Sequence, residues 1–128
     1  MLQLCYISTA RPSVDAAAIE AILRTARTHN AAAQVTGLLL YNGRRFLQVL
    51  EGPDHAVRSI YDRIATDPRH FAMVQLSERT IDAREFAAWD MAYQTLALDH
   101  GALCDRIEQL TQGASASVRA LFTSYAAI

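Results

Sequence analysis

The feature that most constrains the fold is a pair of apolar segments joined by Asn42-Gly43, within the stretch QVTGLLLYNGRRFLQVLEGP. An Asn-Gly pair between two apolar runs is the strongest short-range signal for a β-hairpin with a two-residue turn. A turn of this length fixes the register of the two strands. The expected cross-strand pairs are Tyr41 with Arg44, Leu39 with Phe46, and Gly37 with Gln48. Gln48 would then face a residue without a side chain, which leaves room beside it for a ligand.

Hydrophobic periodicity on either side of the hairpin indicates further strands and helices. Alternation of Leu2, Leu4 and Tyr6 with their neighbours predicts a first strand that ends near residue 9. A helix would follow, with Ser13 as its N-cap and its end near 29–30, and a second helix would begin at Asp54 and end near 66–68. The other expected elements are strands at 73–77 and 91–95 and helices at 98–111 and 115–125.

The order β-α-β-β-α-β(-β) is that of a ferredoxin-like sheet, so we expect an α/β (α+β) fold. Phe46, Gln48 and Leu50 would lie on one face of the third strand, with Leu47 and Val49 on the other. Because both faces are then largely apolar, we expect the two main helices on one face. The C-terminal helical hairpin, or a second subunit, would cover the other. We therefore divide the chain into a core, residues 1–96, and a hairpin, residues 97–128, that caps the sheet or mediates oligomerisation.

Composition and charge exclude several classes of protein. A chain of 128 residues with a net charge of −1 favours one domain and offers no electrostatic footprint for nucleic acid or an anionic membrane. The longest uninterrupted apolar run, Gly37–Tyr41, is too short to span a bilayer, and the opening residues lack the pattern of a secretory signal. We therefore expect a cytoplasmic protein. Cys5 and Cys104 are expected to be reduced, and the spacing of the four histidines predicts no metal site.

Gln48 is the polar residue that stands out, because a buried amide left unpaired costs about 1–3 kcal/mol. One explanation is a core Gln paired with a neighbouring group, and the other is a ligand contact. In a ferredoxin-like sheet the first and third strands are antiparallel neighbours, so Tyr6 and Gln48 would lie side by side. This sets a phenol donor beside an amide that both donates and accepts. A strand Tyr is usually a core residue, so the pair by itself leaves both explanations open.

Several separated motifs resemble the BLUF family, the sensors of blue light using FAD, from Leu2 to about Thr95. They are LCYIS, then HN followed by VTGLLLYNGRRFLQVLEGP, then IYDRIATDPRH, and finally FAAWDMAY. Their order and spacing make the resemblance specific. One departure is the pair Asp90 and Ala92 around Met91, where the family more often has small or apolar residues, especially Gly after Met.

The resemblance implies a blue-light photoreceptor, not an enzyme, that binds oxidised FAD, with FMN or riboflavin as alternatives. It implies that Tyr6 gives an electron and then a proton to the excited flavin, and that the amide of Gln48 rotates or tautomerises. The fifth strand and the C-terminal helices would carry the signal outward. Because no effector domain follows Ile128, we expect a separate downstream signalling protein as partner, and we also expect a homo-oligomer.

The resemblance also implies the residues of the site. The photoactive set is Tyr6, Gln48, Trp89 and Met91. The flavin-binding set is Tyr6, Ser8, Ile22, His29, Asn30, Leu39, Phe46, Gln48, Val49, Ile64, Arg63, Asp67, Arg69, His70 and Met91.

Two other functions remain open at this stage. A ferredoxin-like hydrolase of the acylphosphatase kind shares the strand order and would use Arg11 and Asn30 to hold phosphate. Alternatively, the chain would be a flavin-free interaction module whose C-terminal helices dimerise. Neither accounts for the joint occurrence of Asn30, Gln48, Trp89 and Met91.

Overall fold

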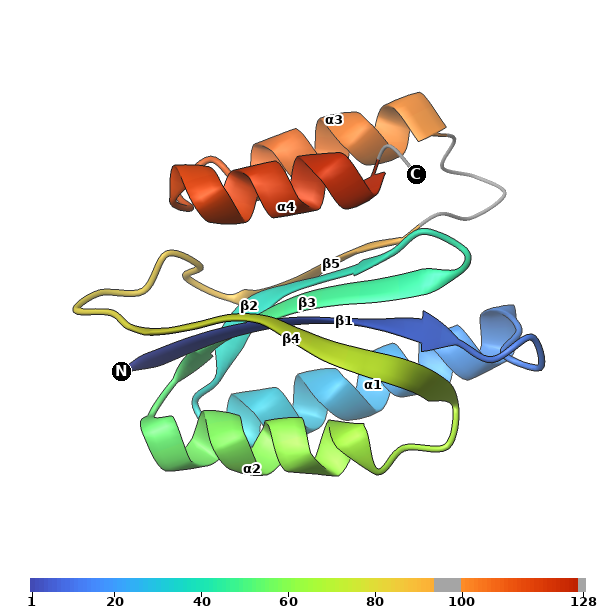
Figure 1. Cartoon of the computed structure of the whole chain (residues 1–128), viewed down its shortest axis with the longest axis horizontal. Coiled ribbons are helices and arrows are strands. Elements are labelled where there is room, and N and C mark those ends of the chain that lie inside the picture. The colour runs from blue at the N-terminus through green and yellow to red at the C-terminus, as the bar shows by residue number, and fades with distance from the viewer. Residues whose placement is uncertain (94–99, 127–128) are drawn as a thin grey trace.

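The computed structural model describes the backbone of residues 1–93 and 100–126, and the side chains of residues 1–89 and 101–124. A twisted sheet forms the middle layer, with α1 and α2 on one face and α3 and α4 on the other (Figure 1). This arrangement confirms the predicted fold class. The elements are β1 (Leu2–Ala10), α1 (Ala16–Ala32), β2 (Thr36–Tyr41), β3 (Arg45–Gly52), α2 (Asp54–Ala65), β4 (His70–Thr80), β5 (Trp89–Tyr93), α3 (His100–Leu110) and α4 (Ala116–Ala126).

The strand order in the sheet is β4-β1-β3-β2-β5. β1 pairs antiparallel with both β3 and β4, β2 pairs antiparallel with β3, and β5 runs parallel to β2 at the edge. The prediction that the first and third strands are antiparallel neighbours is therefore confirmed. It places Tyr6 directly opposite Gln48.

The predicted hairpin register is wrong, although the hairpin itself is present. Leu39 lies opposite Gln48, and Gly37 lies opposite Leu50. The cause is the side chain of Asn42, whose Oδ1 accepts hydrogen bonds from the backbone N–H groups of residues 44 and 45 at 3.1 and 2.9 Å. The two-residue loop is consequently Gly43-Arg44, with a positive φ of 94° at Gly43, a conformation that suits glycine at the first loop position.

Gly37 has a different role from the predicted one, because it leaves no space beside Gln48. A Cβ atom at Gly37 would lie 1.9 Å from the carbonyl oxygen of Val49 on the neighbouring strand. The glycine is thus required by the close approach of two backbones. The error in register is a shift of two residues along β3, and such a shift keeps every side chain on its predicted face.

The helix boundaries differ from the predicted ones in detail. Asp15, not Ser13, is the N-cap of α1, since its Oδ1 accepts from the backbone N–H of Ala18 at 2.8 Å. α1 continues to Ala32, past the predicted end at 29–30, and α2 begins at Asp54 as expected. β4 is longer than predicted, and β5 begins two residues earlier, at Trp89.

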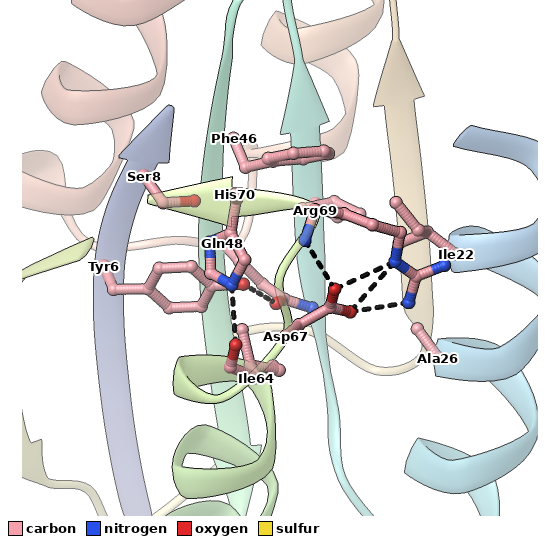
Figure 2. A pocket seen from close by; sticks show the side chains of 11 residues that line it. Tyr6, Ser8, Ile22, Ala26, Phe46, Gln48, Ile64, Asp67, Arg69 and His70 are labelled. Carbon is pink, nitrogen blue, oxygen red and sulfur yellow. Dashed lines mark hydrogen bonds and ion pairs between the residues drawn. The ribbon is translucent and has the colours of Figure 1, made fainter. Parts of the chain in front are cut away.

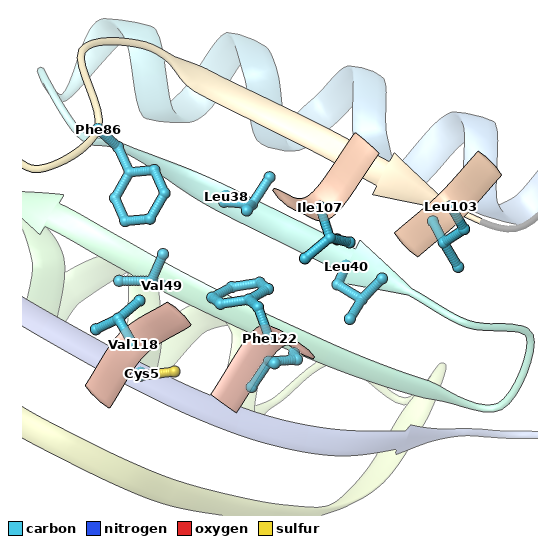
Figure 3. Close-up of a cluster of buried hydrophobic side chains, with 10 residues drawn as sticks. Cys5, Leu38, Leu40, Val49, Phe86, Leu103, Ile107, Val118 and Phe122 are labelled. Carbon is cyan, nitrogen blue, oxygen red and sulfur yellow. The ribbon is translucent and has the colours of Figure 1, made fainter. Parts of the chain in front are cut away.

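The sheet is apolar on both faces, so the core has two layers. Beneath α3 and α4, a cluster of buried residues includes Val49 of β3, Leu103 of α3 and Phe122 of α4 (Figure 3). On the opposite face, side chains of β1, β2 and β3 pack against α1 and α2. Cys5 belongs to the first layer, and burial raises the pKa of its thiol to about 12, so it is a neutral, unreactive thiol.

Parts of some predictions fall outside the described residues, namely the end of the fifth strand at 94–95 and the start of the third helix at 98–99. Within the described ranges, no helix is long and apolar enough to cross a membrane. The same part of the chain contains no group of three or more His, Cys, Asp and Glu side chains that could hold a metal ion.

Candidate functional site

The site is built around the hydrogen bond between Tyr6 and Gln48. The phenolic Oη of Tyr6 donates to Oε1 of Gln48 at 2.6 Å. The two residues are 3% and 2% exposed, so water does not compete for the bond. β1 and β3 position the pair directly, because Tyr6 and Gln48 are cross-strand partners on one face of the sheet.

The environment of Tyr6 keeps its phenol protonated. Burial raises the pKa of Tyr6 far above its ordinary value of 10, and the nearby Cys5, Tyr61 and Asp67 raise it further. In this arrangement the protonated phenol donates and Oε1 of Gln48 accepts. Nε2 of Gln48 makes no hydrogen bond with any of the described residues and is left to the cavity that Gln48 lines.

A cavity opens in front of this pair, between the sheet and the two helices α1 and α2 (Figure 2). Its inner part has about 70 Å³ accessible to the centre of a water molecule, and a wider part with about 510 Å³ adjoins it. The two parts share six lining residues. These are Ile22, Ala26, Gln48, Ile64, Asp67 and Arg69.

Two buried polar atoms of residues that line the inner part lack a hydrogen-bond partner in the part of the chain that the structure describes. They are Oγ of Ser8 and Nδ1 of His70. The other ring nitrogen of His70 lies 2.6 Å from the carbonyl oxygen of Ile64, at the end of α2. Orphaned polar groups are rare in native interiors, so these atoms indicate a ligand with polar atoms at its edge.

An ion pair between Asp67 and Arg69 lies where the two parts of the cavity meet. The guanidinium donates through Nε to both carboxylate oxygens, at 2.9 and 3.1 Å, and through a terminal nitrogen at 2.5 Å. Hydrogen bonding from Arg69 holds the pKa of the Asp67 carboxyl below its usual range. A fixed carboxylate with a guanidinium beside it therefore lines this wall at neutral pH.

Asn30 lies further along α1, in the lining of the wider part, and is only 2% exposed. With its amide oriented so that both ends are satisfied, Nδ2 donates to the carbonyl of Ala26 at 3.3 Å, and Oδ1 accepts from the indole Nε1 of Trp89 at 2.8 Å. Trp89 thus lies on the same side of the sheet as the cavity, packed against the cluster that contains Leu39 and Phe46. The side chain of Met91 lies outside the described residues, although its backbone pairs with Leu39.

The structure brings most of the predicted site residues together around this cavity. The inner part is lined by Tyr6, Ser8, Ile22, Leu39, Phe46, Gln48, Ile64, Asp67, Arg69 and His70, and the wider part adds His29, Asn30 and Arg63. Trp89 lines neither part of the cavity. Val49 does not line the cavity either. It points to the other face of the sheet and packs under α3 and α4, because successive strand residues face opposite ways.

Several lining residues were missing from the predicted set. They are Thr25, Ala26, Ile60, Thr66 and Pro68. Ala26 and Ile60 lie on the apolar faces of α1 and α2, so helical periodicity could have predicted that they face the sheet. Arg11 donates to the carbonyl of Pro68 and lies over the ring of Phe71. It lines neither part of the cavity, so it does not share a site with Asn30. The phosphate site of a hydrolase is therefore not formed.

Comparison with known proteins agrees with this geometry. The BLUF family model, sensors of blue-light using FAD, matches residues 1–92. The blue light- and temperature-regulated antirepressor BluF of Escherichia coli K12 is 39% identical over 95 residues, which cover 74% of this chain and 24% of that protein. The photoactivated adenylate cyclase subunit beta of Euglena longa is 39% identical over 93 residues, or 72% of this chain and 11% of that protein.

Two solved structures with a similar fold are also of BLUF proteins. The dark-state structure of the BLUF protein BlrB has a TM-score of 0.74 and 32% identity, with 98% of this chain and 95% of that chain covered. Klebsiella pneumoniae BlrP1 with FMN and cyclic diGMP has a TM-score of 0.82 and 28% identity, with 99% and 35% covered.

The fold and the family match define a flavin-binding photosensor domain. The chain belongs to the BLUF family, and its matched part, residues 1–92, is a blue-light sensor domain. It spans only 24% and 11% of the two relatives compared by sequence, whose further segments have no counterpart in the match.

The residues around the cavity fit a flavin. An isoalloxazine ring is flat, apolar on its dimethylbenzene side, and bordered on the other side by carbonyl oxygens, ring nitrogens and an N–H group. Ile22 and Ile64 supply opposed apolar walls from α1 and α2. Oγ of Ser8, Nδ1 of His70 and Nε2 of Gln48 have no hydrogen-bond partner among the described residues, and they can supply polar partners for the ring edge.

Proposed function

We propose that the chain senses blue light through Tyr6 and Gln48 with an oxidised flavin in the cavity between α1 and α2. The observation that supports this most strongly is the 2.6 Å hydrogen bond between two buried side chains at the cavity wall. When bound, the flavin supplies absorption of blue light and, once excited, an acceptor for one electron. FAD is the form we propose, with FMN or riboflavin as alternatives.

Tyr6 is the residue that we assign as donor of the electron and then of its phenolic proton. Its raised pKa means that the electron must leave a neutral phenol, not a phenolate. The hydrogen bond gives the departing proton a defined acceptor, Oε1 of Gln48. Return of the electron and the proton to Tyr6 leaves no covalent product, so the lasting change is in the amide.

Gln48 is the switch in this proposal because an amide has a donor end and an acceptor end that can be exchanged in place. Rotation would turn Nε2 toward the phenol of Tyr6 and Oε1 toward the cavity, and tautomerisation would change the same partners without rotation. Either change alters the hydrogen bond that Gln48 offers to a ligand. Asn30, Asp67 and Arg69 would hold the polar edge of the ring, and His29 and Arg63 would lie nearer the surface.

The test is an absorption spectrum of the purified protein, reconstituted with FAD and recorded in the dark and under blue light. We expect a yellow protein with a small, reversible red shift. Tyr6→Phe should abolish the shift while the flavin stays bound, and Tyr41→Phe, a buried tyrosine of β2 that does not line the cavity, should retain it. Normal switching by Tyr6→Phe would show that its assigned role is wrong. A colourless protein after reconstitution would instead support the flavin-free interaction module.

The downstream partner, self-association and a cytoplasmic location stay predictions. Relatives carry such a domain in proteins named as an antirepressor and as adenylate cyclase subunits. We propose that this chain likewise acts on a protein effector and that the signal leaves through β5 and the α3–α4 hairpin.

A further inference from the structure

Two side-chain hydrogen bonds join β1 to β3, and they lie on opposite faces of the sheet. Tyr6 is bonded to Gln48 on the face covered by α1 and α2. Nε2 of Gln3 donates to Oε2 of Glu51 at 2.7 Å, and Glu51 shares its face with Val49, beneath α3 and α4. Three residues separate the two pairs along each strand, a distance of about 10 Å. The strands that carry the light-sensing pair therefore carry a second polar pair on their far side.

Glu51 holds the connection between β4 and β5. It is fully buried, and its Oε1 accepts hydrogen bonds from the backbone N–H groups of Glu85 and Phe86 at 3.0 and 2.9 Å. Phe86 in turn packs in the cluster beneath the α3–α4 hairpin (Figure 3). Because a buried carboxylate must keep its partners, the position of residues 85 and 86 follows the position of Glu51.

Glu85 then reaches the hairpin itself. Its Oε1 accepts from the backbone N–H of Ser115 at 2.6 Å, and Ser115 immediately precedes α4, where a carboxylate is favoured by the helix dipole. Its Oε2 pairs with Arg79 at 2.5 Å and also accepts from Nε2 of Gln3. The turn before α4 lies close, since a Cβ at Gly113 would be 3.1 Å from the carbonyl oxygen of Glu85.

The charge state of Glu85 suits this role. Burial opposes ionisation of its carboxyl, but the hydrogen bonds from Gln3, Arg79 and Ser115 outweigh burial and lower its pKa. Glu85 is therefore a carboxylate at neutral pH. Arg79 also donates through Nε to Oε1 of Gln3 at 2.6 Å, so each end of the Gln3 amide is occupied.

We propose that Glu85 couples the strands of the pocket to the α3–α4 hairpin, with Gln3 and Glu51 as the link through the sheet. The proposal rests on the light-sensing function proposed above, because the rearrangement at Gln48 is its input. A movement of β3 against β1 changes the relation of Glu51 to Gln3, and both of these residues bond to Glu85. Glu85 is thus a positioning residue, which acts on the start of α4 and does not touch the ligand.

The test follows amide exchange by NMR in the flavin-loaded protein, in the dark and under blue light. Glu85→Ala removes the contact to α4, whereas Gln3→Ala breaks the side-chain link from β1 to Glu51 and Glu85 and leaves that contact in place. In the dark, Glu85→Ala should raise the exchange rate of the Ser115 amide about five- to tenfold, the loss of roughly one hydrogen bond, and Gln3→Ala should not. The matched control is Glu108→Ala, an exposed carboxylate on α3.

Under light, the wild-type protein and Glu108→Ala should change the exchange rates of α3 and α4. Gln3→Ala and Glu85→Ala should keep the reversible red shift and lose at least half of that change. A wild-type response in Gln3→Ala, or a red shift without any change in α3 and α4 of the wild type, would overturn the proposal. If the wild type shows no red shift, the proposed function fails instead, and the dark exchange of Ser115 still tests the hold of Glu85 on α4.

A second variant keeps the proposal testable if Glu85→Ala does not fold. Gly113→Ala adds a methyl group against the carbonyl of Glu85 and shifts the turn before α4. We expect it to retain the red shift and to lose the response of the hairpin. An unchanged response in Gly113→Ala would count against the proposal.

Discussion

Removal of the Tyr6 hydroxyl should destabilise the flavin-free protein by more than the value of one hydrogen bond. A typical net contribution is about 0.5–1.5 kcal/mol, but Tyr6→Phe also leaves Oε1 of Gln48 buried and unpaired, which raises the expected cost to about 1–3 kcal/mol. Gln48→Leu leaves the phenol of Tyr6 unpaired, and its cost should be similar. The double variant leaves neither group unpaired, so its cost should fall below the sum of the single costs by about 1–3 kcal/mol.

The assay is equilibrium urea unfolding of the wild type, the two single variants and the double variant, all freed of flavin. Flavin must be absent because a ligand that binds the folded state adds stability of its own, by RT ln(1 + [L]/Kd). Tyr41→Phe serves as a control for loss of a tyrosine hydroxyl from the same sheet. If the costs of the two single variants add to within about 0.5 kcal/mol, the pair is not coupled, and the reasoning about the buried hydrogen bond between Tyr6 and Gln48 is refuted.

Four further predictions follow from the same geometry. Gly37→Ala should cost more than about 3 kcal/mol in urea unfolding because its Cβ would meet the carbonyl of Val49, while Gly43→Ala, with open space around it, should cost only about 1–2 kcal/mol. Val49→Ala should destabilise the fold by roughly 1–3 kcal/mol and leave the flavin Kd within about twofold in a titration, since it lies on the far face. Asp67→Asn should weaken flavin binding in the same titration by about tenfold, because it breaks the ion pair that shapes the pocket wall. The pKa of Tyr6 in the folded protein lies above the value of about 10 that the same side chain has in the unfolded chain. This group should therefore leave the free energy of unfolding unchanged below about pH 10 and lower it as the pH rises further. Ultraviolet titration should detect the Tyr6 phenolate only as the protein unfolds.

The meeting of Tyr6 and Gln48 could be predicted from the sequence because it depends on topology and on strand alternation. The register could not, since it was decided by the side chain of Asn42, which bonds two backbone N–H groups and moves the turn by one residue. The error in register did not change which residues were predicted to face the site. A shift of two residues along β3 leaves Gln48 on the same face, and only a shift of one would have turned it to the other side.

The predicted pocket residues show where resemblance and physical pattern disagree. Val49 entered the set by resemblance alone, although the alternation of β3 already put it on the face opposite Gln48 and Phe46. The structure follows the alternation. By contrast, no local pattern could reveal that the indole of Trp89 donates to Asn30, because 59 residues separate the two, and β5 must first pair with β2 before they meet.

Part of the coupling proposed for Glu85 could have been predicted from strand alternation in the sequence. Gln3 and Glu51 lie in strands whose neighbouring residues are apolar, at positions that alternation assigns to the buried face under the C-terminal helices. A carboxylate in such a place requires partners, and strand pairing supplies one of them, Gln3, directly opposite. The other partners come from the backbone at 85 and 86, which only the path of the chain after β4 determines. Tyr6 and Gln48 lie three residues away on the same two strands. The hydrogen bonds that satisfy the buried carboxyl group of Glu51 on one face therefore connect that face to the light-sensing pair on the other.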